Sequence, residues 1–268
     1  MAHAHRCFVD IASGGECPEA GGMFSLDREE SHHLVKVLRA RPGDPVVLFS
    51  GDGREWTGIL DPWPGRLPRE VPIRIAEMRQ LPPPALSLHL IQAIPKGKTM
   101  DQLVRRVVEL GVTRISPLVT DHSENRTSGE RTDQQIQRWR QQAIEAGKQS
   151  GNSFLPVFDP IQTLDAFLAD QSFAGKGFFG DLAPGASLLG ERLDAWAKDP
   201  ARSNCLRWFI GPEGDFSDRE KDLLRRCGVV GVSFGTLVLR CETAALFALS
   251  ATLAHWQARH RGSPDNEH

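Results

Sequence analysis

The sequence predicts an α/β protein in two domains, a small and mostly β domain at residues 1–80 and a larger domain at residues 81–268. Short strand patterns separated by turn residues fill residues 6 to about 78. Strand and helix patterns then alternate, which is typical of a mostly parallel sheet covered on both faces. Between the two parts, Leu81-Pro82-Pro83-Pro84 forms a stiff extended connector, and we place the domain boundary there.

The first domain is expected to contain one helix among its strands. Asp27 is placed to cap a helix over residues 28–38, whose apolar side chains recur at helical spacing. Gly51-Asp52-Gly53 is typical of a hairpin turn, because glycine tolerates the backbone angles that such turns require. Strands are expected at residues 7–11, 46–49, 55–60 and 71–78.

The second domain shows strand patterns alternating with helix patterns. The strands are expected at residues 86–91, 114–119, 154–158, 177–181, 206–210 and 229–234. One helix is expected to start at Thr99, with Gln102 completing a capping box, and another to cover residues 132–149. Ser217 and Glu220 have the spacing of a second capping box, and an alanine-rich helix follows residue 243.

The composition is that of a globular protein with no membrane span and no metal site. The longest apolar stretch, residues 244–254, is too short to cross a bilayer. The first ten residues lack the apolar core of a signal peptide, so we expect a cytoplasmic protein. The five cysteines show no C-x-x-C spacing, which argues against both a disulfide framework and a zinc site.

The charge balance does not by itself indicate nucleic-acid binding. Lys and Arg number 10 against 12 Asp and Glu in residues 1–80, and 22 against 22 in the remainder. Any RNA contact must therefore come from local basic patches. The candidates are Arg39, Arg41, Lys96, Lys98, Arg105, Arg106, Arg138 and Arg140. Most surface Lys and Arg side chains only face solvent, and Trp139 beside two of these arginines is more typical of packing.

The stretch from Trp208 to Leu246 carries the candidate site. Two strand patterns within it end at glycines about one β-α-β unit apart, at Gly211-Pro212-Glu213-Gly214 and at Gly235. In an open α/β sheet, ligands bind at the carboxyl ends of strands. No G-x-G-x-x-G motif follows the first strand, and there is no P-loop lysine motif. Together with Gly180-Asp181-Leu182, these turns favour a pocket for a neutral nucleoside that main-chain groups recognise.

Each of these motifs also has a purely structural interpretation. Gly-Pro-Glu-Gly alone is typical of an ordinary turn, and Leu-Arg-Cys-Glu-Thr alone is typical of a helix start. At this spacing, however, GPEG-x-FS-x-x-E followed by LRCETA resembles the C-terminal signature of the SPOUT methyltransferases, and specifically of the RsmE family.

Three further motifs extend this resemblance over nearly the whole chain. Residues 33–53 resemble the N-terminal PUA-like β-barrel of the family, residues 96–112 the opening of its catalytic domain, and residues 138–150 the next helix. The resemblance implies an enzyme that uses S-adenosylmethionine to methylate N3 of a uracil, conventionally numbered 1498, in 16S ribosomal RNA of the small subunit. It also implies an α/β trefoil knot, an RNA-binding PUA-like domain and a homodimer.

The resemblance assigns the cofactor to three strand ends. The implied contacts are Gly180, Leu182, Gly211, Pro212, Glu213, Gly214, Gly235, Leu237, Leu239 and Arg240. Uracil N3 holds its proton at neutral pH, so the reaction needs a base or a group that stabilises the developing anion. We predict that Arg240 stabilises the anion, because a guanidinium holds two acceptors at once. Glu242 and Glu213 are both candidates to take the proton, although each also suits a structural role.

The chain departs from the family pattern at a few positions. Where the family usually has Glu-Gln-Ser-x-Arg, this chain has Lys148-Gln149-Ser150-Gly151-Asn152, and Lys148 becomes a further candidate for RNA contact. Asp215 replaces a usual glycine and Cys241 a usual threonine. Two alternatives therefore stay open: a SPOUT methyltransferase that acts on another RNA, and a non-catalytic RNA-binding or ribosome assembly factor. The intact glycine turn and Arg240 favour an enzyme.

Overall fold

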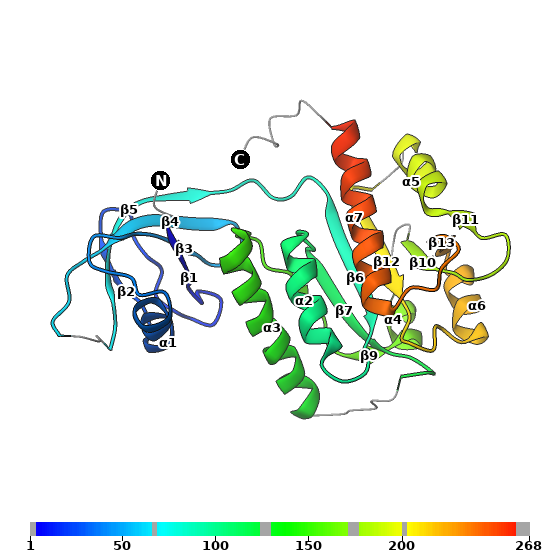
Figure 1. Cartoon of the computed structure of the whole chain (residues 1–268), viewed down its shortest axis with the longest axis horizontal. Helices are drawn as coiled ribbons and strands as arrows, with labels where there is room; N and C mark the ends of the chain where they lie inside the picture. The colour runs from blue at the N-terminus through cyan, green and yellow to red at the C-terminus, as the bar shows by residue number, and fades with distance from the viewer. Residues whose placement is uncertain (1–3, 66–68, 124–129, 171–176, 200–202, 261–268) are drawn as a thin grey trace. The chain divides into compact units, whose positions relative to one another are not determined.

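The computed structural model describes residues 4–65, 69–123, 130–170, 177–199 and 203–260 (Figure 1). The chain divides into two compact units, Met1–Pro83 with Ile144–Leu155, and Pro84–Ala143 with Pro156–His268. Among the described residues, the first unit contains a five-stranded sheet and the second an eight-stranded sheet. The predicted α/β class is confirmed.

The sheet of the first unit is built mainly from the predicted strands. Its strands are β1 (His5–Phe8), β2 (Met23–Ser25), β3 (Pro45–Phe49), β4 (Arg54–Leu60) and β5 (Pro72–Gln80), in the order β1-β3-β4-β5-β2. β1 runs parallel to β3, and the other neighbours are antiparallel. The sequence analysis did not predict β2, because three residues are too few to show an alternating pattern. The alternating inner side chains, such as Leu48, Trp56 and Ile73, are fully buried in one core.

The predicted helix over residues 28–38 is present but changes type in its middle. α1 (Arg28–His32) begins as predicted at Asp27, whose side chain accepts a hydrogen bond from Glu30 N at 2.8 Å. It continues as the π-helix η1 (His33–Val37). Arg39, two residues after the end of η1, has φ of 57°, in the left-handed region. Wider π turns and left-handed residues other than glycine are uncommon, and propensity alone does not predict them.

A segment from the middle of the chain completes the first unit. The end of α3 (Glu130–Ser150) and the residues after it belong to this unit. Gly53 N donates to Ser153 O at 3.0 Å, and Leu155 N donates to Gly51 O at 2.8 Å. The prediction of a strand over residues 154–158 is therefore wrong in its first half. Phe154 forms only an isolated bridge with Asp52, because its neighbours bond to the β3–β4 turn.

A buried carboxylate ties this segment to the sheet. Glu55 on β4 is only 2% exposed and accepts hydrogen bonds from Arg6 Nη2 at 3.0 Å, Arg79 Nε at 2.8 Å and the Ser153 hydroxyl. Burial alone would raise the pKa of Glu55, but these donors more than offset it and hold the pKa below its ordinary value. The carboxylate is therefore ionised in the folded protein.

Replacing Glu55 with glutamine is expected to destabilise the protein by about 1–3 kcal/mol at pH 7, because the amide carries no charge and presents an N–H donor where one carboxylate oxygen accepted a hydrogen bond. Since the folded pKa is depressed, the carboxylate stabilises the fold above the unfolded value of roughly 4.3 and loses this effect as pH falls through the folded pKa. Urea denaturation of both proteins at pH 7 and at acidic pH measures this. A difference in unfolding free energy that does not shrink in acid would contradict the prediction.

The sheet of the second unit is parallel throughout. Its strands are β6 (Ser87–Ala93), β7 (Arg114–Val119), β8 (Val157–Phe158), β9 (Gln162–Thr163), β10 (Gly177–Gly180), β11 (Ser187–Leu188), β12 (Cys205–Ile210) and β13 (Val230–Ser233). The order is β11-β13-β10-β12-β6-β7-β8, and β9 also pairs with β7. The pairs are all parallel, which confirms the predicted sheet type.

Helices cover both faces of this sheet (Figure 1). They are α2 (Thr99–Glu109), the first part of α3, α4 (Leu164–Ala169), α5 (Leu189–Lys198), α6 (Asp218–Arg226) and α7 (Cys241–Arg259). Leu164 and Leu224, from α4 and α6, share a core with Phe209 on one face. On the other face, Trp208 Nε1 donates to Thr252 Oγ1 of α7 at 3.0 Å. Within the described residues, no helix combines the length and apolar character needed to cross a membrane.

The two predicted capping boxes had different outcomes. Ser217 and Glu220 form the complete box at the start of α6, as predicted. The box at α2 is wrong, because Lys98 is the N-cap and makes no side-chain cap bond. Thr99 is therefore already the first helical residue, and Gln102 lies one position too far along to reach back.

Candidate functional site

A cavity of about 250 Å³ lies at the carboxyl ends of β10, β12 and β13. These strands are parallel neighbours in the order β13-β10-β12, so the turns that follow them meet at one edge of the sheet. The cavity is thus formed entirely within the second unit. It occupies the position where open α/β sheets bind ligands.

The structure brings together almost all of the residues predicted to hold the cofactor. Lining the cavity are Gly180, Leu182, Gly211, Pro212, Glu213, Gly235, Leu237, Leu239 and Arg240. Gly214 does not line it and instead packs against His122. Asp181, from the predicted Gly180-Asp181-Leu182 turn, and Val238, from the predicted segment 235–240, also line it. The lining residues that were not predicted are Ile210, Asp215, Phe234, Cys241 and Ala244. Each of these is next to, or a few residues from, a predicted one, so adjacency to the strand-end glycines was the available signal.

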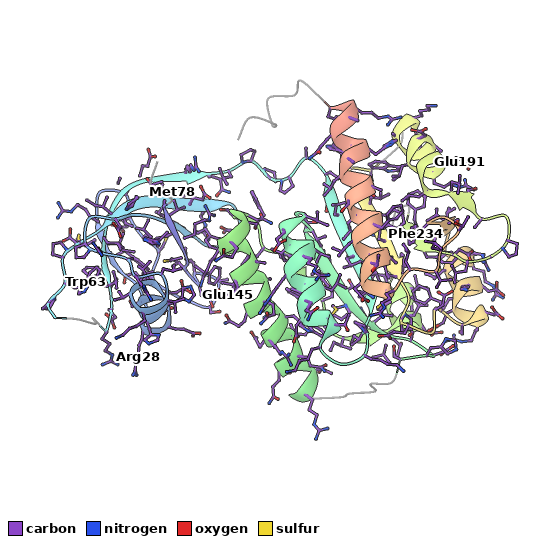
Figure 2. All side chains as sticks on the ribbon, in the orientation of Figure 1. Arg28, Trp63, Met78, Glu145, Glu191 and Phe234 are labelled. Atoms are coloured by element: carbon purple, nitrogen blue, oxygen red, sulfur yellow. The ribbon has the colours of Figure 1, made fainter. Side chains whose placement is uncertain are left out.

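The exit of β10 is shaped by close contacts with β13. A Cβ on Gly180 would lie 2.9 Å from the ring of Phe234, so glycine lets this aromatic ring approach the strand. Phe234, which is labelled in Figure 2, in turn packs between Trp208 and Phe247, whose ring centroids lie 5.9 and 5.7 Å from its own. The apolar floor of the cavity is therefore continuous with the core between the sheet and α7.

Asp181 lies at the cavity but its carboxylate is committed elsewhere. Arg225 Nη2 donates to Asp181 Oδ2 at 2.8 Å, and Ala183 N donates to Oδ1 at 3.0 Å. A Cβ on Gly231 would lie 2.4 Å from Oδ2, so the carboxylate fits only beside a glycine. These contacts fix the backbone of the β10 turn.

The turn after β12 contains a strained residue. Asp215 has φ of 61°, in the left-handed region that favours glycine. Its Oδ1 accepts from Phe216 N at 2.7 Å, and its Oδ2 pairs with Lys221 Nζ at 2.7 Å. The glycine that the family resemblance gives as usual at this position would adopt this conformation without strain. Asp is one of the few other residues that tolerate it.

The segment after β13 supplies apolar and cationic groups. Gly235 has φ of 113°, and the two apolar side chains Leu237 and Val238 are 74% and 78% exposed. Arg240 lies at the N-cap of α7 with its side chain exposed, and its guanidinium forms no ion pair with the described part of the chain. An unpaired cation beside an apolar cavity can bind or stabilise an anion there.

The three predicted catalytic residues are not equivalent in the structure. Arg240 and Glu213 line the cavity, whereas Glu242 does not. Glu213 Oε1 accepts a hydrogen bond from Lys96 N at 3.0 Å. Glu242 Oε2 accepts from Cys241 Sγ at 3.3 Å, within the first turn of α7. Glu213 is therefore nearer the cavity than Glu242, while each carboxylate also accepts a hydrogen bond, from a distant backbone N–H and from a neighbouring thiol respectively.

The Cys241 thiol is predicted to be chemically inert although it lies at the cavity. Burial, reinforced by the hydrogen bond to Glu242, raises the pKa of Cys241 to about 12. Alkylation by iodoacetamide at pH 8 is expected to be at least about 100-fold slower than at the exposed Cys17, because the thiolate is the nucleophile. Peptide mapping by mass spectrometry over time measures both rates. Equal labelling of the two cysteines in the native protein would refute this.

The predicted RNA-contact residues fall into different environments. Arg39 and Arg41 in the first unit, and Lys96, Lys98, Arg106 and Arg140 in the second, are exposed. Arg138 is exposed but its Nη2 bonds to Asp101, and Arg105 Nε donates to Gln142 at 2.5 Å. Trp139 is 3% exposed, as expected for packing.

Lys148 has a different environment from the other basic candidates. It is buried in the first unit, where its ammonium bonds to the Glu30 carboxylate and, at 2.9 Å, to Glu145 Oε1 on the same helix. Burial lowers the pKa of Lys148, but Glu30 more than offsets this and keeps the pKa above its ordinary value. An enclosed, paired ammonium is not available to a phosphate. This placement supports a structural role in place of the predicted RNA contact.

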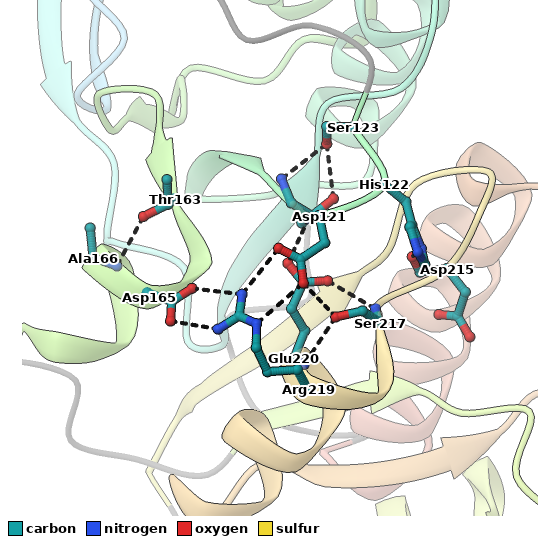
Figure 3. A network of polar contacts seen from close by, with 11 residues as sticks. Asp121, His122, Ser123, Thr163, Asp165, Ala166, Asp215, Ser217, Arg219 and Glu220 are labelled. Atoms are coloured by element: carbon teal, nitrogen blue, oxygen red, sulfur yellow. Dashed lines mark hydrogen bonds and ion pairs between the residues drawn. The ribbon is translucent and has the colours of Figure 1, made fainter.

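A polar network that the sequence analysis missed adjoins the turn after β12 (Figure 3). Arg219 binds Asp121 and Asp165 through both guanidinium branches, and Glu220 accepts from Asp121 N at 3.0 Å. Asp121 and its neighbour His122 follow β7 in the sequence, so no local motif links them to α6. Among the described residues, no group of three or more His, Cys, Asp or Glu side chains is arranged to hold a metal ion.

Family models match most of the chain. Residues 82–253 match the model of an RNA methyltransferase domain, and residues 26–61 match that of an RNA methyltransferase PUA domain. Among curated relatives, the ribosomal RNA small subunit methyltransferase E of Synechocystis sp. is 29% identical, over 84% of this chain and 71% of that protein. The protein of the same name from Bacillus subtilis is 27% identical, over 92% of this chain and 94% of that protein.

Solved structures show the same fold with a cofactor bound. The ribosomal RNA small subunit methyltransferase E of Neisseria gonorrhoeae, bound to S-adenosyl methionine, has a TM-score of 0.81 and 28% identity, covering 95% of this chain and 98% of that one. A protein from Legionella pneumophila in complex with SAM has a TM-score of 0.79 and 29% identity, covering 94% of this chain and 98% of that one.

Proposed function

Because this chain belongs to the RNA methyltransferase family, we propose that it methylates N3 of a uracil, the one numbered 1498, in 16S ribosomal RNA, with S-adenosylmethionine as the methyl donor. The observation that carries the proposal is the cavity at the ends of β10, β12 and β13, lined by Gly211, Glu213 and Arg240. The curated relatives named for small-subunit rRNA methylation support the substrate, and a neighbour with bound S-adenosyl methionine supports the cofactor.

The lining of the cavity suits this cofactor in its chemistry. Its apolar residues, such as Ile210, Phe234 and Leu239, can contact a purine ring, while the glycine turns expose main-chain groups that can recognise its edges. No cationic cluster for a triphosphate lines it, since Arg240 is the single Lys or Arg among its lining residues. When bound, the cofactor supplies an electrophilic methyl group.

The residues of the chain itself must hold the target base and accept its proton. Arg240 is proposed to stabilise the negative charge that develops on the uracil as N3 loses its proton. Glu213 is the better placed of the two candidate proton acceptors, because it lines the cavity and Glu242 does not. The target base has to be presented outside any helical stack for N3 to be reached.

Further features of the family resemblance remain proposals for this chain. We propose that residues 1–80 act as a PUA-like RNA-binding domain, with Arg39 and Arg41 as its contacts, and that residues 81–268 form the knotted catalytic domain. A homodimer is supported by the exposed apolar side chains of Leu237, Val238 and Phe247, which suit a protein surface better than water. We also propose that the enzyme acts in the cytoplasm, which is consistent with an rRNA substrate.

The test is transfer of a labelled methyl group from S-adenosylmethionine to small ribosomal subunits that lack their own N3 mark. Transfer that maps to one uracil is the expected result. Absence of transfer by a folded protein that binds the cofactor would overturn the proposed target and favour another RNA. Absence of cofactor binding would favour a non-catalytic RNA-binding or assembly role.

A further inference from the structure

His122 lies beside the turn that follows β12, although it comes from the loop after β7. Its Nδ1 is 2.9 Å from Gly214 O and 2.9 Å from Asp215 O. Both partners are carbonyl oxygens, which only accept hydrogen bonds. The proton must therefore be on Nδ1, and Nε2 of the neutral ring is left as an acceptor.

The electrostatics agree with this assignment. The hydrogen bond to the Asp215 carbonyl, followed by the one to the Gly214 carbonyl, raises the pKa of His122. Nδ1–H donates to the two carbonyls in both the neutral and the charged ring, so the contact does not depend on one protonation state. His122 is exposed, and its position must come from the loop that carries it.

The loop around His122 is held firmly on both sides (Figure 3). Before His122, Asp121 N donates to Glu220 Oε1 at 3.0 Å, and the Asp121 carboxylate accepts from Ser217 Oγ at 2.6 Å and from Arg219. After it, Ser123 Oγ is 2.9 Å from Thr120 Oγ1 and accepts from Thr120 N. The loop is thus anchored to the start of α6, which directly follows the turn.

The turn is also shaped to receive the imidazole. A Cβ on Gly214 would lie 3.2 Å from His122 Cβ, closer than ordinary contact, and 3.4 Å from its Cγ. This explains why Gly214, alone of the predicted cofactor residues, does not line the cavity. Its missing side chain makes room for the ring on the other side of the turn.

We propose that His122 is a positioning residue for the cofactor site, holding the Gly214 and Asp215 carbonyls so that the turn over residues 211–215 keeps the shape of the cavity. The inference rests on the proposed function. Asp215 has a positive φ, and such a strained residue persists only where surrounding contacts determine it. The Asp215 carboxylate makes two of these contacts, to Phe216 N and to Lys221 Nζ, and the Asp215 carbonyl makes the third, to His122 Nδ1.

The experiment measures binding of S-adenosylmethionine by calorimetry and steady-state methyl transfer for wild type, His122→Ala and His122→Asn. For His122→Ala we expect a roughly 10-fold increase in the cofactor Kd and KM, with kcat at saturation within about 3-fold of wild type. His122→Asn should restore binding to within about 3-fold, because its amide N–H can replace Nδ1–H. His32→Ala, at an exposed histidine of the first unit, is the matched control and should bind like wild type.

A double-mutant cycle with Gly214→Ala tests the contact directly. The added methyl would meet both the Cβ and the ring of His122, so it should weaken cofactor binding in the wild type and cost less in His122→Gly, where both are removed. Thermal unfolding of each variant separates loss of fold from loss of binding.

Three outcomes would overturn the inference. Cofactor binding unchanged in His122→Ala would show that the turn does not need the histidine. Cofactor binding by His122→Asn that is as weak as binding by His122→Ala would show that the Nδ1–H donor is not the functional group. Normal cofactor binding with a large loss of kcat would assign His122 to the chemistry. If the wild type itself binds no cofactor, the proposed function fails instead.

Discussion

Replacing Arg240 with alanine is expected to lower kcat for methyl transfer to the small subunit by about 10²–10³-fold, the effect of removing one preorganised donor to a developing anion. The structure supports this expectation by two observations. Arg240 lines the cavity, and its guanidinium has no carboxylate partner in the described part of the chain. A guanidinium that is not neutralised by a neighbour retains its full charge for the substrate.

The chain offers two controls for this measurement. Arg240→Lys keeps the charge but loses the two-pronged donor, so we expect a kcat between those of wild type and alanine variant. Arg226→Ala removes an exposed arginine at the end of α6, away from the cavity lining, and should leave kcat unchanged. An Arg240→Ala enzyme with a normal kcat would remove Arg240 from the mechanism, and a raised cofactor KM alone would assign it to binding.

Replacing Lys148 with glutamate, the residue usual in the family, is expected to destabilise the protein by about 3–5 kcal/mol, as when one partner of a buried ion pair is removed. The side chains of Lys148 and Glu30 are 5% and 12% exposed, and Glu145 lies three residues before Lys148 on α3. The substitution would bring three carboxylates together in a largely buried site. Urea denaturation at pH 7 measures the loss.

Arg131→Glu is the matched control, because it reverses an exposed charge on the same helix and should change stability by less than about 0.5 kcal/mol. Lys148→Met with Glu30→Gln removes both charges and is expected to recover much of the lost stability. The affinity of Lys148→Met for RNA is then compared with that of the wild type. A Lys148→Met variant that is as stable as wild type but binds RNA more weakly would restore the RNA-contact role and refute the structural one.

The sequence by itself determined the features that depend on local patterns. The strands β3, β4, β6, β7 and β12 were predictable because runs of apolar or alternating residues between turn signals have few other structures available. The capping box at Ser217 was predictable because donor and acceptor lie three residues apart. The position of the cavity followed from the same logic, since parallel strands place their terminal glycines at one edge, whereas its individual lining residues were implied by the family resemblance.

Features that depend on contacts between distant segments were decided only by the tertiary structure. Lys148 was predicted as a candidate for RNA contact, yet it pairs with Glu30, 118 residues away in the sequence. His122 and Gly214 are likewise far apart in the chain, and neither the tautomer of the one nor the need for the other is visible locally. A charged or polar side chain takes its role from the partners that folding brings to it. The sequence pattern predicts which segments form strands and helices, and only the packed structure shows which polar groups are brought into contact.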